Sequence, residues 1–398
     1  MRYEESSHGS SQPAGLFNAI STFKCFLHGE YPMSRGLKGL ESKVLDRGQC
    51  AACGACLSLC PYLRSWKGKA VKLHDCDLSE GRCFSFCPRT EVDLDALHRS
   101  VFGKGYEDIE TGPARRVVMA RALTLEFTKR AQNGGVVSAL MAVALEEGRI
   151  QAAILTERDS ELLPQGRIAK TKEDLLTCAG SSYVTGYTLE ALNRGPWQGQ
   201  ERIGVVGLPC QVLALARMKA SPLEMRTPID RVDLVVGLFC TWALDYRPFA
   251  GFLKERFGDK PIRKLDITPP PERLLNVTVG DEFHQIPLDD IRAFIRPSCQ
   301  VCLDMTSELS DLSVGTVEGE EGWNTVIVRT ARGEDLLRLA ESKGVLETRV
   351  YPDDKWVHLK WASVLKKQRG LNALKDVQEK YVTLPQKVID AILKEVAP

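Results

Sequence analysis

Cysteine is the residue type whose number and spacing say most about the chemistry of this sequence. The chain has 398 residues and 13 cysteines, and eight of the cysteines precede residue 90. In a long chain without an export signal, clustered cysteines are more often metal ligands than disulfide partners. Residues 1–12 are polar and carry two Glu, which is not how a secretory signal begins. We therefore expect a cytoplasmic metalloprotein.

The first cysteine run has the spacing of a bacterial ferredoxin. Cys50, Cys53, Cys56 and Cys60 follow the pattern Cys-x2-Cys-x2-Cys-x3-Cys, and Pro61 comes next. With this spacing, one tight loop presents three thiolates to three corners of a 4Fe–4S cube. The helix expected after Cys60 directs the fourth thiolate to a second cluster. A structural zinc site is the alternative, but such sites usually join two ligand pairs that are well separated in sequence.

The second cysteine run departs from the ferredoxin pattern. Cys76, Cys83 and Cys87 keep only the closing Cys-x3-Cys-Pro of that pattern. By the usual crossover, Cys87 completes the first cluster, and Cys60 joins Cys76 and Cys83 in the second. The second cluster is then one ligand short. Its fourth ligand is open among Asp75, Asp77, His74 and the distant Cys25, and a three-iron cluster or a lost cluster are the other readings.

Four more cysteines stand far apart in the second half of the chain. Cys210 and Cys240 each follow a short apolar run, and Cys299 and Cys302 form a Cys-x2-Cys pair. The carboxyl ends of parallel strands face one crevice, so these four thiols form a cage for a third 4Fe–4S cluster if both runs are strands. An all-cysteine zinc site and buried structural cysteines are the alternatives. The two remaining cysteines, Cys25 and Cys178, are read as ordinary thiols.

The elements that must position these cysteines alternate between strand and helix after residue 115. The predicted strands are residues 120–124, 151–156, 203–206, 232–238, 311–314 and 325–329, and the predicted helices are residues 135–147 and 172–178. This alternation favours an α/β core, and residues 274–286 read as an added β-hairpin that turns at Gly280-Asp281. The expected fold class is α+β / α/β. It divides into an N-terminal extension (residues 1–45), a ferredoxin-type iron–sulfur domain (46–98), an α/β core (113–350) and a helical tail (351–398).

The composition argues against several classes of protein. Lys+Arg 53 against Asp+Glu 52 gives a net charge of +1, which supports neither a nucleic-acid-binding surface nor a polybasic membrane anchor. No apolar run reaches the roughly 20 residues of a transmembrane helix. The Gly-rich fingerprints of dinucleotide and P-loop sites are missing. Glycine- and serine-rich turns at residues 132–135, 180–183 and 315–319 are nevertheless suited to cradle a phosphate.

Several stretches together resemble a known family, the beta subunits of coenzyme F420-reducing hydrogenases and formate dehydrogenases. The resemblance runs in order from about residue 113 to residue 350. It is carried by Gln132-Asn133-Gly134-Gly135-Val136-Val137-Ser138-Ala139-Leu140, Ala179-Gly180-Ser181-Ser182-Tyr183, Gly207-Leu208-Pro209-Cys210-Gln211, Phe239-Cys240, Cys299-Gln300-Val301-Cys302-Leu303-Asp304, Asp311-Leu312-Ser313-Val314-Gly315 and Gly322-Trp323-Asn324-Thr325-Val326-Ile327-Val328-Arg329-Thr330. The ferredoxin-like part in front looks like the fused arrangement of some members.

The resemblance implies an FAD-containing oxidoreductase subunit that exchanges a hydride with coenzyme F420, an 8-hydroxy-5-deazaflavin. It implies that Cys210, Cys240, Cys299 and Cys302 hold one 4Fe–4S cluster near the flavin. The flavin-binding residues that it implies are Asn133, Gly134, Gly135, Ser138, Gly180, Ser181, Ser182, Tyr183, Gly315, Thr316, Trp323 and Asn324. The coenzyme is anionic, and the basic side chains considered for it are Arg115, Arg116, Arg167 and Lys170. Hydride transfer needs no acid–base pair, so no catalytic residue is assigned.

Electrons are expected to leave through residues 46–98, so a redox partner is expected to dock near that region. The candidate partners are a hydrogenase, a formate dehydrogenase, a disulfide reductase and a membrane electron-transfer complex. Two other functions compete with the coenzyme F420 oxidoreductase: a ferredoxin-dependent reductase of another substrate on the same fold, and a non-enzymatic electron relay in a larger complex.

Overall fold

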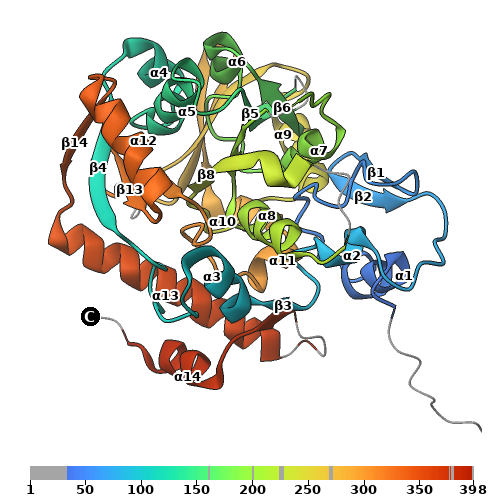
Figure 1. Ribbon diagram of the computed structural model, residues 1–398. Helices are drawn as coiled ribbons and strands as arrows, with labels where there is room; N and C mark the ends of the chain where they lie inside the picture. Colours follow the sequence, from blue (N-terminus) through green and yellow to red (C-terminus); the bar gives the residue numbers. More distant parts are fainter. Residues whose placement is uncertain are drawn as a thin grey trace, which may run out of the picture. The chain divides into compact units, whose positions relative to one another are not determined.

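An eight-stranded mixed sheet forms the centre of the molecule in the computed structural model (Figure 1). The structure describes residues 34–159, 162–199, 201–223, 228–268, 272–375, 377 and 381–396. In spatial order the strands are β14 (Leu346–Val350), β4 (Arg116–Ala122), β13 (Asn324–Val328), β12 (Leu312–Thr316), β8 (Val232–Leu238), β7 (Ile203–Gly207), β5 (Ala152–Arg158) and β6 (Pro164–Ala169). The four strands β12, β8, β7 and β5 are parallel to one another, and the pairs toward both edges are antiparallel.

Strands β7 and β8 are largely apolar, with Asp233 of β8 as the one charged residue, because both faces of the sheet are covered. Val205 and Val235 pack into one hydrophobic core, whereas Val206 and Val236 pack into the other. Continuous Val/Ile/Leu runs are typical of parallel strands buried on both faces. The predicted α/β core with a large sheet is therefore confirmed.

Helices cover both faces of the sheet. On one face lie α4 (Leu125–Arg130), α5 (Val136–Glu146), α6 (Lys172–Thr177) and α12 (Ala331–Ser342). On the other face lie α3 (Leu94–Phe102), α7 (Thr188–Arg194), α8 (Pro209–Ala220) and the one-turn 3-10 helix η2 (Pro228–Arg231), with parts of the C-terminal helices α13 (Asp353–Lys375) and α14 (Gln386–Lys394). The helices predicted at residues 135–147 and 172–178 are thus confirmed as α5 and α6. The strand predicted at residues 120–124 begins earlier, as β4.

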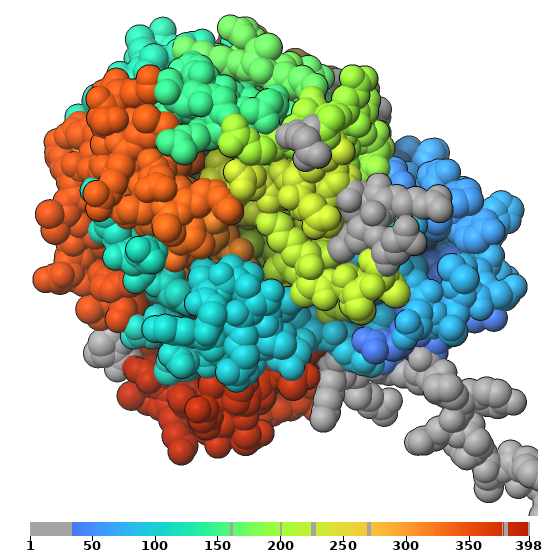
Figure 2. All heavy atoms as spheres, viewed as in Figure 1, coloured from blue at the N-terminus to red at the C-terminus, as the bar shows by residue number. Residues whose placement is uncertain are grey.

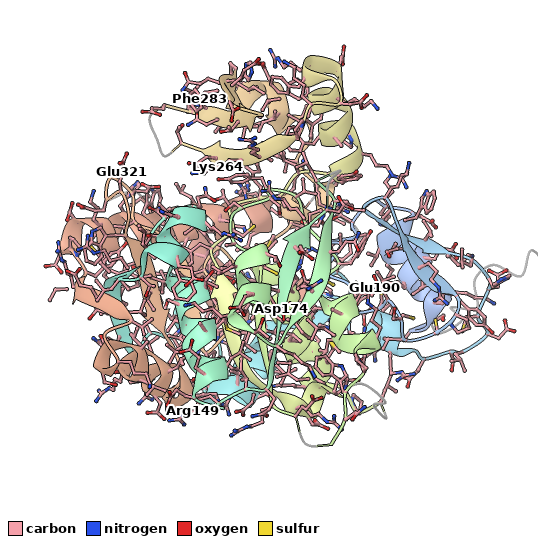
Figure 3. The ribbon with its side chains drawn as sticks, turned by 90° about the horizontal axis from the view of Figure 1, so that it is seen from above. Arg149, Asp174, Glu190, Lys264, Phe283 and Glu321 are labelled. Atoms are coloured by element: carbon pink, nitrogen blue, oxygen red, sulfur yellow. The ribbon has the colours of Figure 1, made fainter. Side chains whose placement is uncertain are left out.

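A smaller antiparallel sheet packs on its own hydrophobic cluster. It consists of β9 (Ile262–Ile267), β10 (Leu274–Val279) and β11 (Glu282–Pro287), next to α9 (Tyr246–Phe257) and α10 (Leu288–Arg292). Lys264 and Phe283 mark this sheet in Figure 3. The predicted hairpin is confirmed as β10 and β11, and Gly280 has the positive φ of 58° that the turn needs. The three prolines before it, residues 269–271, lie outside the described residues.

The cysteine-rich N-terminal unit has short elements and its own buried cluster. They are α1 (Leu37–Leu40), the π-helical turn η1 (Glu41–Leu45), β1 (Leu63–Trp66), β2 (Lys69–Lys72), α2 (Arg82–Ser85) and β3 (Val92–Asp93). The helix expected after Cys60 is absent; the hairpin of β1 and β2 stands there instead, because Lys67 and Gly68 form a turn with positive φ. Of the predicted extension, residues 34–45 pack onto this unit, and residues 1–33 lie outside the described residues.

Where the structure describes it, the C-terminal tail contains two helices and one short strand. Between α13 and α14, β15 (Val382–Thr383) pairs in parallel with β3 of the N-terminal unit. In Figure 2 that unit (blue) lies beside α8 (yellow-green), where Arg217 donates to the carbonyls of Ser85 and Glu91, both at 2.7 Å. No helix within the described ranges is long and apolar enough to cross a membrane.

Candidate functional site

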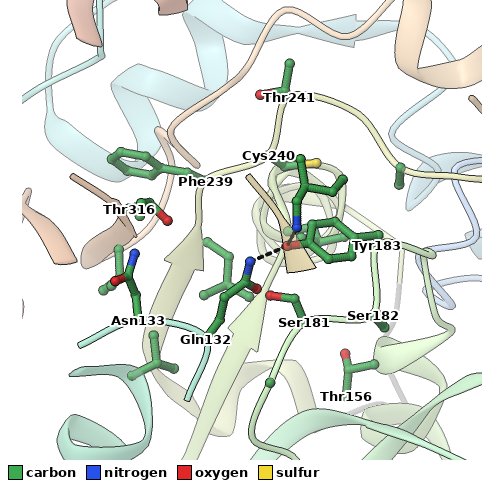
Figure 4. Close-up of a pocket in the computed structure, with 18 of the residues that line it drawn as sticks. Gln132, Asn133, Thr156, Ser181, Ser182, Tyr183, Phe239, Cys240, Thr241 and Thr316 are labelled. Carbon is green, nitrogen blue, oxygen red and sulfur yellow. Dashed lines mark hydrogen bonds between the residues drawn. The ribbon is translucent and has the colours of Figure 1, made fainter. Parts of the chain in front are cut away.

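A large cavity opens at the carboxyl ends of the parallel strands (Figure 4). Its volume is about 1200 Å³, and its walls include the ends of β5, β7, β8 and β12, the start of α5, and parts of β9 and α13. Ligand pockets in proteins typically measure about 300–1,000 Å³. This cavity therefore has room for a cofactor of dinucleotide size.

Ten of the twelve residues predicted to bind the flavin line this cavity. They are Asn133, Gly135, Ser138, Gly180, Ser181, Ser182, Tyr183, Gly315, Thr316 and Asn324. Gly134 and Trp323 are not among the lining residues. Gly134 lies directly behind the wall, where a Cβ atom would stand 2.8 Å from Oδ1 of Asn324.

Trp323 occupies a separate hydrophobic cluster. Its indole is buried against Met119, Val317 and Tyr351. The guanidinium groups of Arg121 and Arg349 lie over its ring, at 4.7 and 4.4 Å from the centroid. These contacts give Trp323 a packing role, in which stacked arginines cover an aromatic face.

The start of α5 is fixed by side chains from the loop before it and from the first residue of β13. Gly135 has φ +72°, a left-handed conformation that suits glycine, and Val136 follows as the first helical residue. Asn324 accepts from the Val136 N–H at 3.4 Å and donates to the Gly315 carbonyl at 3.0 Å, while Asn133 accepts from the Gly322 N–H at 3.0 Å. The helix N-terminus is thereby held at the cavity wall, where its N–H groups favour an anion.

Tyr183 joins two walls of the cavity through its hydroxyl group. Gln132 donates to this hydroxyl and, at 2.7 Å, to the carboxylate of Asp266. The Ile267 N–H also donates to the hydroxyl, at 2.9 Å. Burial raises the pKa of Tyr183 to about 12, so its phenol stays neutral. The loop before α5 and strand β9 are thus connected across the site.

The cations at the cavity differ from those considered from the sequence. Three of the four basic residues considered earlier form ion pairs: Arg116 with Glu341 at 2.7 Å, Arg167 with Asp174 at 3.0 Å and Lys170 with Glu201 at 3.0 Å. The fourth, Arg115, is exposed, and none of the four lines the cavity. The cations that do line it are Arg158, Arg273, Arg292, Lys355, Lys366 and Arg369.

Arg158 is a cavity cation with an unpartnered nitrogen atom in the described part of the chain. It ends β5, its Nη1 atom is buried, and that atom has no hydrogen-bond partner among the described residues. Burial lowers its pKa from the ordinary value. A buried guanidinium without a carboxylate is costly unless an anionic ligand pairs with it. Arg158 was not predicted from the sequence, because the residues next to it along the chain do not show which side chains surround it in the folded protein.

The four scattered cysteines come together beside this cavity. Cys210 is the second residue of α8, Cys240 lies two residues after β8, Cys299 lies in α11 (Pro297–Gln300) and Cys302 lies two residues after it. Burial and then the neighbouring charge of Cys53 raise the pKa of Cys210, and Cys302 and Cys299 raise it further. Burial raises the pKa of Cys240 most, Lys366 opposes it, and Cys299, Cys210 and Cys302 raise that pKa further. We call these four residues the core cysteine set.

Two buried cations accompany the core cysteine set. Burial alone would raise the pKa of Cys302, but Lys366 and Arg89 outweigh it and lower that pKa. Lys366 also donates to the Cys240 carbonyl. Of the four thiols, Cys302 is buried and the other three are partly buried. Thiols and compensating cations are the kinds of group on which the potential of an iron–sulfur cluster depends.

The N-terminal cysteines form two neighbouring sets. In the first, burial raises the pKa of Cys53 to about 12, with Cys87 and Cys50 adding to it, and the pKa of Cys56 is raised by burial, Cys53, Cys50 and Cys87. In the second, burial, Cys60 and Cys76 raise the pKa of Cys83 to about 12, and Cys87 of the first adds to it. The crossover of ligands between two clusters stays a prediction, and we call the groups the first and second N-terminal sets.

The second set shows no clear fourth ligand among the residues that the structure describes. Asp75 pairs with Lys72 at 2.8 Å, Asp77 with Lys38 at 3.6 Å, and His74 packs edge-on against Tyr62. Cys25 lies outside the described residues. Within the described ranges, no group of three or more His, Cys, Asp or Glu side chains could hold a metal ion. A 4Fe–4S cube differs from a single ion because each thiolate binds a different iron.

The first N-terminal set is anchored to the core. The Leu189 N–H donates to the Cys53 carbonyl at 3.1 Å, and Asn193 donates to the carbonyls of Ala55 and Leu57 at 3.0 and 2.8 Å. Glu190, labelled in Figure 3, accepts from Ser58 at 3.0 Å. The cysteine loop is therefore held in place by α7 of the core.

Arg89 lies between the first N-terminal set and the core set. It is buried and bonds the Ser298 carbonyl at 3.3 Å, and its charge lowers the pKa of Cys53 and of Cys210, one cysteine from each set. Arg89, Cys210 and Cys302 also line one small pocket, and Arg89 follows Cys87 by two residues, so the two sets are neighbours across this boundary.

The fold and site define a cysteine-rich α/β protein with a ligand cavity next to a four-cysteine set. Residues 117–193 match the family model for the N-terminal part of the coenzyme F420 hydrogenase/dehydrogenase beta subunit, and residues 200–354 match the model for its C-terminal part. The chain belongs to the coenzyme F420 hydrogenase/dehydrogenase beta-subunit family, as the sequence resemblance predicted.

Individual relatives support this membership. The chain is 31% identical over 242 residues to the coenzyme F420 hydrogenase subunit beta of Methanothermobacter thermautotrophicus, covering 60% of this chain and 85% of that protein. It is 30% identical over 321 residues to the coenzyme F420-dependent sulfite reductase of Methanocaldococcus jannaschii, covering 76% of this chain and 47% of that protein. A chain in the solved F420-reducing NiFe hydrogenase complex from Methanosarcina barkeri matches with TM-score 0.61 and 29% identity, over 67% of this chain and 93% of that chain.

Proposed function

We propose that this protein is an iron–sulfur flavoprotein subunit that passes electrons between coenzyme F420 and iron–sulfur clusters through FAD. The cavity would hold FAD and admit the coenzyme, and the cysteine sets would hold the clusters. A bound flavin supplies the conversion between two-electron hydride transfer and one-electron transfer. The protein supplies position, charge and exclusion of water.

The observation that carries this proposal is that Cys240 belongs to two sites. It belongs to the core cysteine set and also lines the cavity, where Figure 4 labels it between Phe239 and Thr241. Lys366 likewise lines the cavity and contacts Cys240 through its carbonyl. A cofactor in the cavity and a cluster on these cysteines would therefore share one wall, which suits direct electron transfer.

The charge of the cavity supports an anionic ligand. The buried Nη1 atom of Arg158 has no partner in the part of the chain that the structure describes, and the N-terminus of α5 opens on the same cavity. Both features favour the phosphates of FAD or the anionic groups of coenzyme F420.

The neighbouring cysteine sets support a route out of the core. Electrons would pass from the core set through Cys210 and Cys53 to the first N-terminal set, then to the second. A relative in an F420-reducing hydrogenase complex supports a redox partner, which would dock near residues 46–98. Such a partner would be a hydrogenase or another redox complex of the kinds expected from the sequence.

The proposal is tested on anaerobically purified protein replete in iron and FAD. Reduced coenzyme F420 is mixed with the protein and a viologen dye, and coenzyme oxidation with dye reduction is expected. Cys240→Ser is expected to lose the iron of the core set and to slow dye reduction. Cys178→Ser is the control and should keep its iron, because burial is the main influence on the Cys178 thiol and no other cysteine is among the groups that act on it. If FAD-loaded protein does not oxidise the reduced coenzyme, the proposal is wrong.

A reductase of another substrate is the second candidate. The match to the F420-dependent sulfite reductase covers more of this chain than the match to the hydrogenase beta subunit, although the chain spans about half of that relative. Reduction of sulfite or another substrate with ferredoxin as electron donor, without binding of coenzyme F420, would favour this candidate. A non-enzymatic relay would instead show cluster signals without bound flavin.

A further inference from the structure

The hydroxyl group of Tyr187 is buried without a visible reason. The side chain is 5% exposed, and its oxygen has no hydrogen-bond partner among the residues that the structure describes. Buried hydroxyl groups in native proteins nearly always donate to an acceptor, so each exception calls for an explanation.

The surroundings of Tyr187 contain the first N-terminal cysteine set. Tyr187 packs in the hydrophobic cluster that includes Cys87, Cys50 and Cys56. After burial, the largest electrostatic influence on its phenol comes from Cys50, followed by Arg296 and Cys56. The unpaired hydroxyl is thus close to two of the cysteines expected to carry a cluster.

Arg296 brings a positive charge to the same place. Its Nε and Nη2 atoms donate to the Cys50 carbonyl at 3.3 and 2.9 Å. Its Nη1 atom is buried without a hydrogen-bond partner in the described part of the chain, 3.7 Å from the Asp245 carboxylate. A hydroxyl and a guanidinium therefore stand beside one set of thiols.

The backbone holds Tyr187 against the cysteine loop. At Gly54, a Cβ atom would lie 2.8 Å from the Tyr187 carbonyl oxygen, so only glycine allows this approach. The Glu190 N–H closes the turn by donating to the same oxygen at 3.0 Å. The position of the Tyr187 ring is consequently set by main-chain contacts rather than by its own hydroxyl.

We propose that the Tyr187 hydroxyl donates a hydrogen bond to a sulfur atom of the cluster on Cys50, Cys53, Cys56 and Cys87, and that it raises the reduction potential of this cluster together with Arg296. The inference rests on the proposed function. The reduced cluster carries one more negative charge than the oxidised cluster, so a donor and a cation stabilise it more. Tyr187 belongs to the core and would tune a cluster of the N-terminal unit by direct contact. A higher potential there favours electron flow out of the core set.

The test is an EPR-monitored redox titration of the iron-replete, FAD-loaded protein. Tyr187→Phe keeps the ring and removes only the unpaired hydroxyl. We expect the iron content to stay unchanged. For one cluster, the ratio of reduced to oxidised protein at a given potential should fall about tenfold, which corresponds to a midpoint potential about 59 mV lower for a one-electron couple. Tyr381→Phe is the matched control, because that buried hydroxyl donates to the Lys43 carbonyl at 3.0 Å, and its loss should leave all midpoints in place.

A second measurement uses the wild-type protein. Pulsed EPR in D2O should detect an exchangeable deuteron coupled to the reduced cluster, and Tyr187→Phe should lack it. Cluster signals with identical midpoints and deuteron couplings in wild type and Tyr187→Phe would overturn this inference alone. Absence of any cluster signal in the iron-replete wild type would instead overturn the proposed function.

Discussion

Gly315, at the end of β12, lines the cavity at a point where no side chain fits. A Cβ atom there would stand 1.9 Å from Cδ2 and 2.3 Å from Cγ of the Phe239 ring. Carbon atoms pack best at about 3.5–4.0 Å, so Gly315→Ala requires the ring to move by roughly 1.5–2 Å. Phe239 lines the same cavity and precedes Cys240, as Figure 4 shows. The displaced ring is therefore expected to take up ligand space.

Overpacking of this kind typically costs about 1–3 kcal/mol. If FAD fills the cavity, that strain appears on binding, and the Kd for FAD should rise roughly 5- to 150-fold. The assay is the quenching of flavin fluorescence in a titration of flavin-free protein. Gly251→Ala is the control: in α9 its Cβ meets nothing within 4 Å, so FAD affinity should not change. Wild-type FAD affinity in Gly315→Ala would refute Phe239 as a wall of the flavin site.

Three further predictions concern buried charges. Arg158→Leu should weaken binding of FAD or raise the KM for reduced coenzyme F420 by roughly tenfold or more, since a charge-assisted hydrogen bond contributes about 1.5–3 kcal/mol; unchanged values for both would exclude an anion at Arg158. Lys367→Met should destabilise the protein by about 3–5 kcal/mol in urea unfolding, because the Lys367 side chain is 0% exposed and its partner Glu308 stays buried without it; the double variant with Glu308→Gln should recover part of the loss. Burial lowers the pKa of His98 to about 4, so the unfolded chain binds a proton below pH 6.5 that the folded chain does not. Stability should therefore fall from pH 6.5 toward pH 4, by about 3 kcal/mol in all, and an equally steep fall in His98→Phe would contradict this.

Local signals predicted much of the fold. The Val/Leu-rich run of β8 predicted that strand, because burial on two faces requires apolar residues within a short segment. Gly135 predicted the start of α5, because its left-handed conformation favours glycine at that position. The edge strands β6 and β14 were missed, since each has an exposed face and a mixed composition. The prediction of a helix after Cys60 was wrong, because the turn at Lys67 and Gly68 favours a hairpin.

For the candidate site, the sequence by itself determined the cysteine loop and the family. Cys50, Cys53 and Cys56 lie within seven residues of each other, so their spacing alone predicts a shared loop, and the family motifs follow one another in order along the sequence. Only the tertiary structure decided which groups share a wall or lack a partner. Cys240 reaches both the cavity and the core cysteine set because strands far apart in sequence end at one edge of the sheet, and within the described ranges the buried Nη1 atom of Arg158 has no hydrogen-bond partner. Burial and pairing of charges depend on such long-range packing, and no local pattern encodes them.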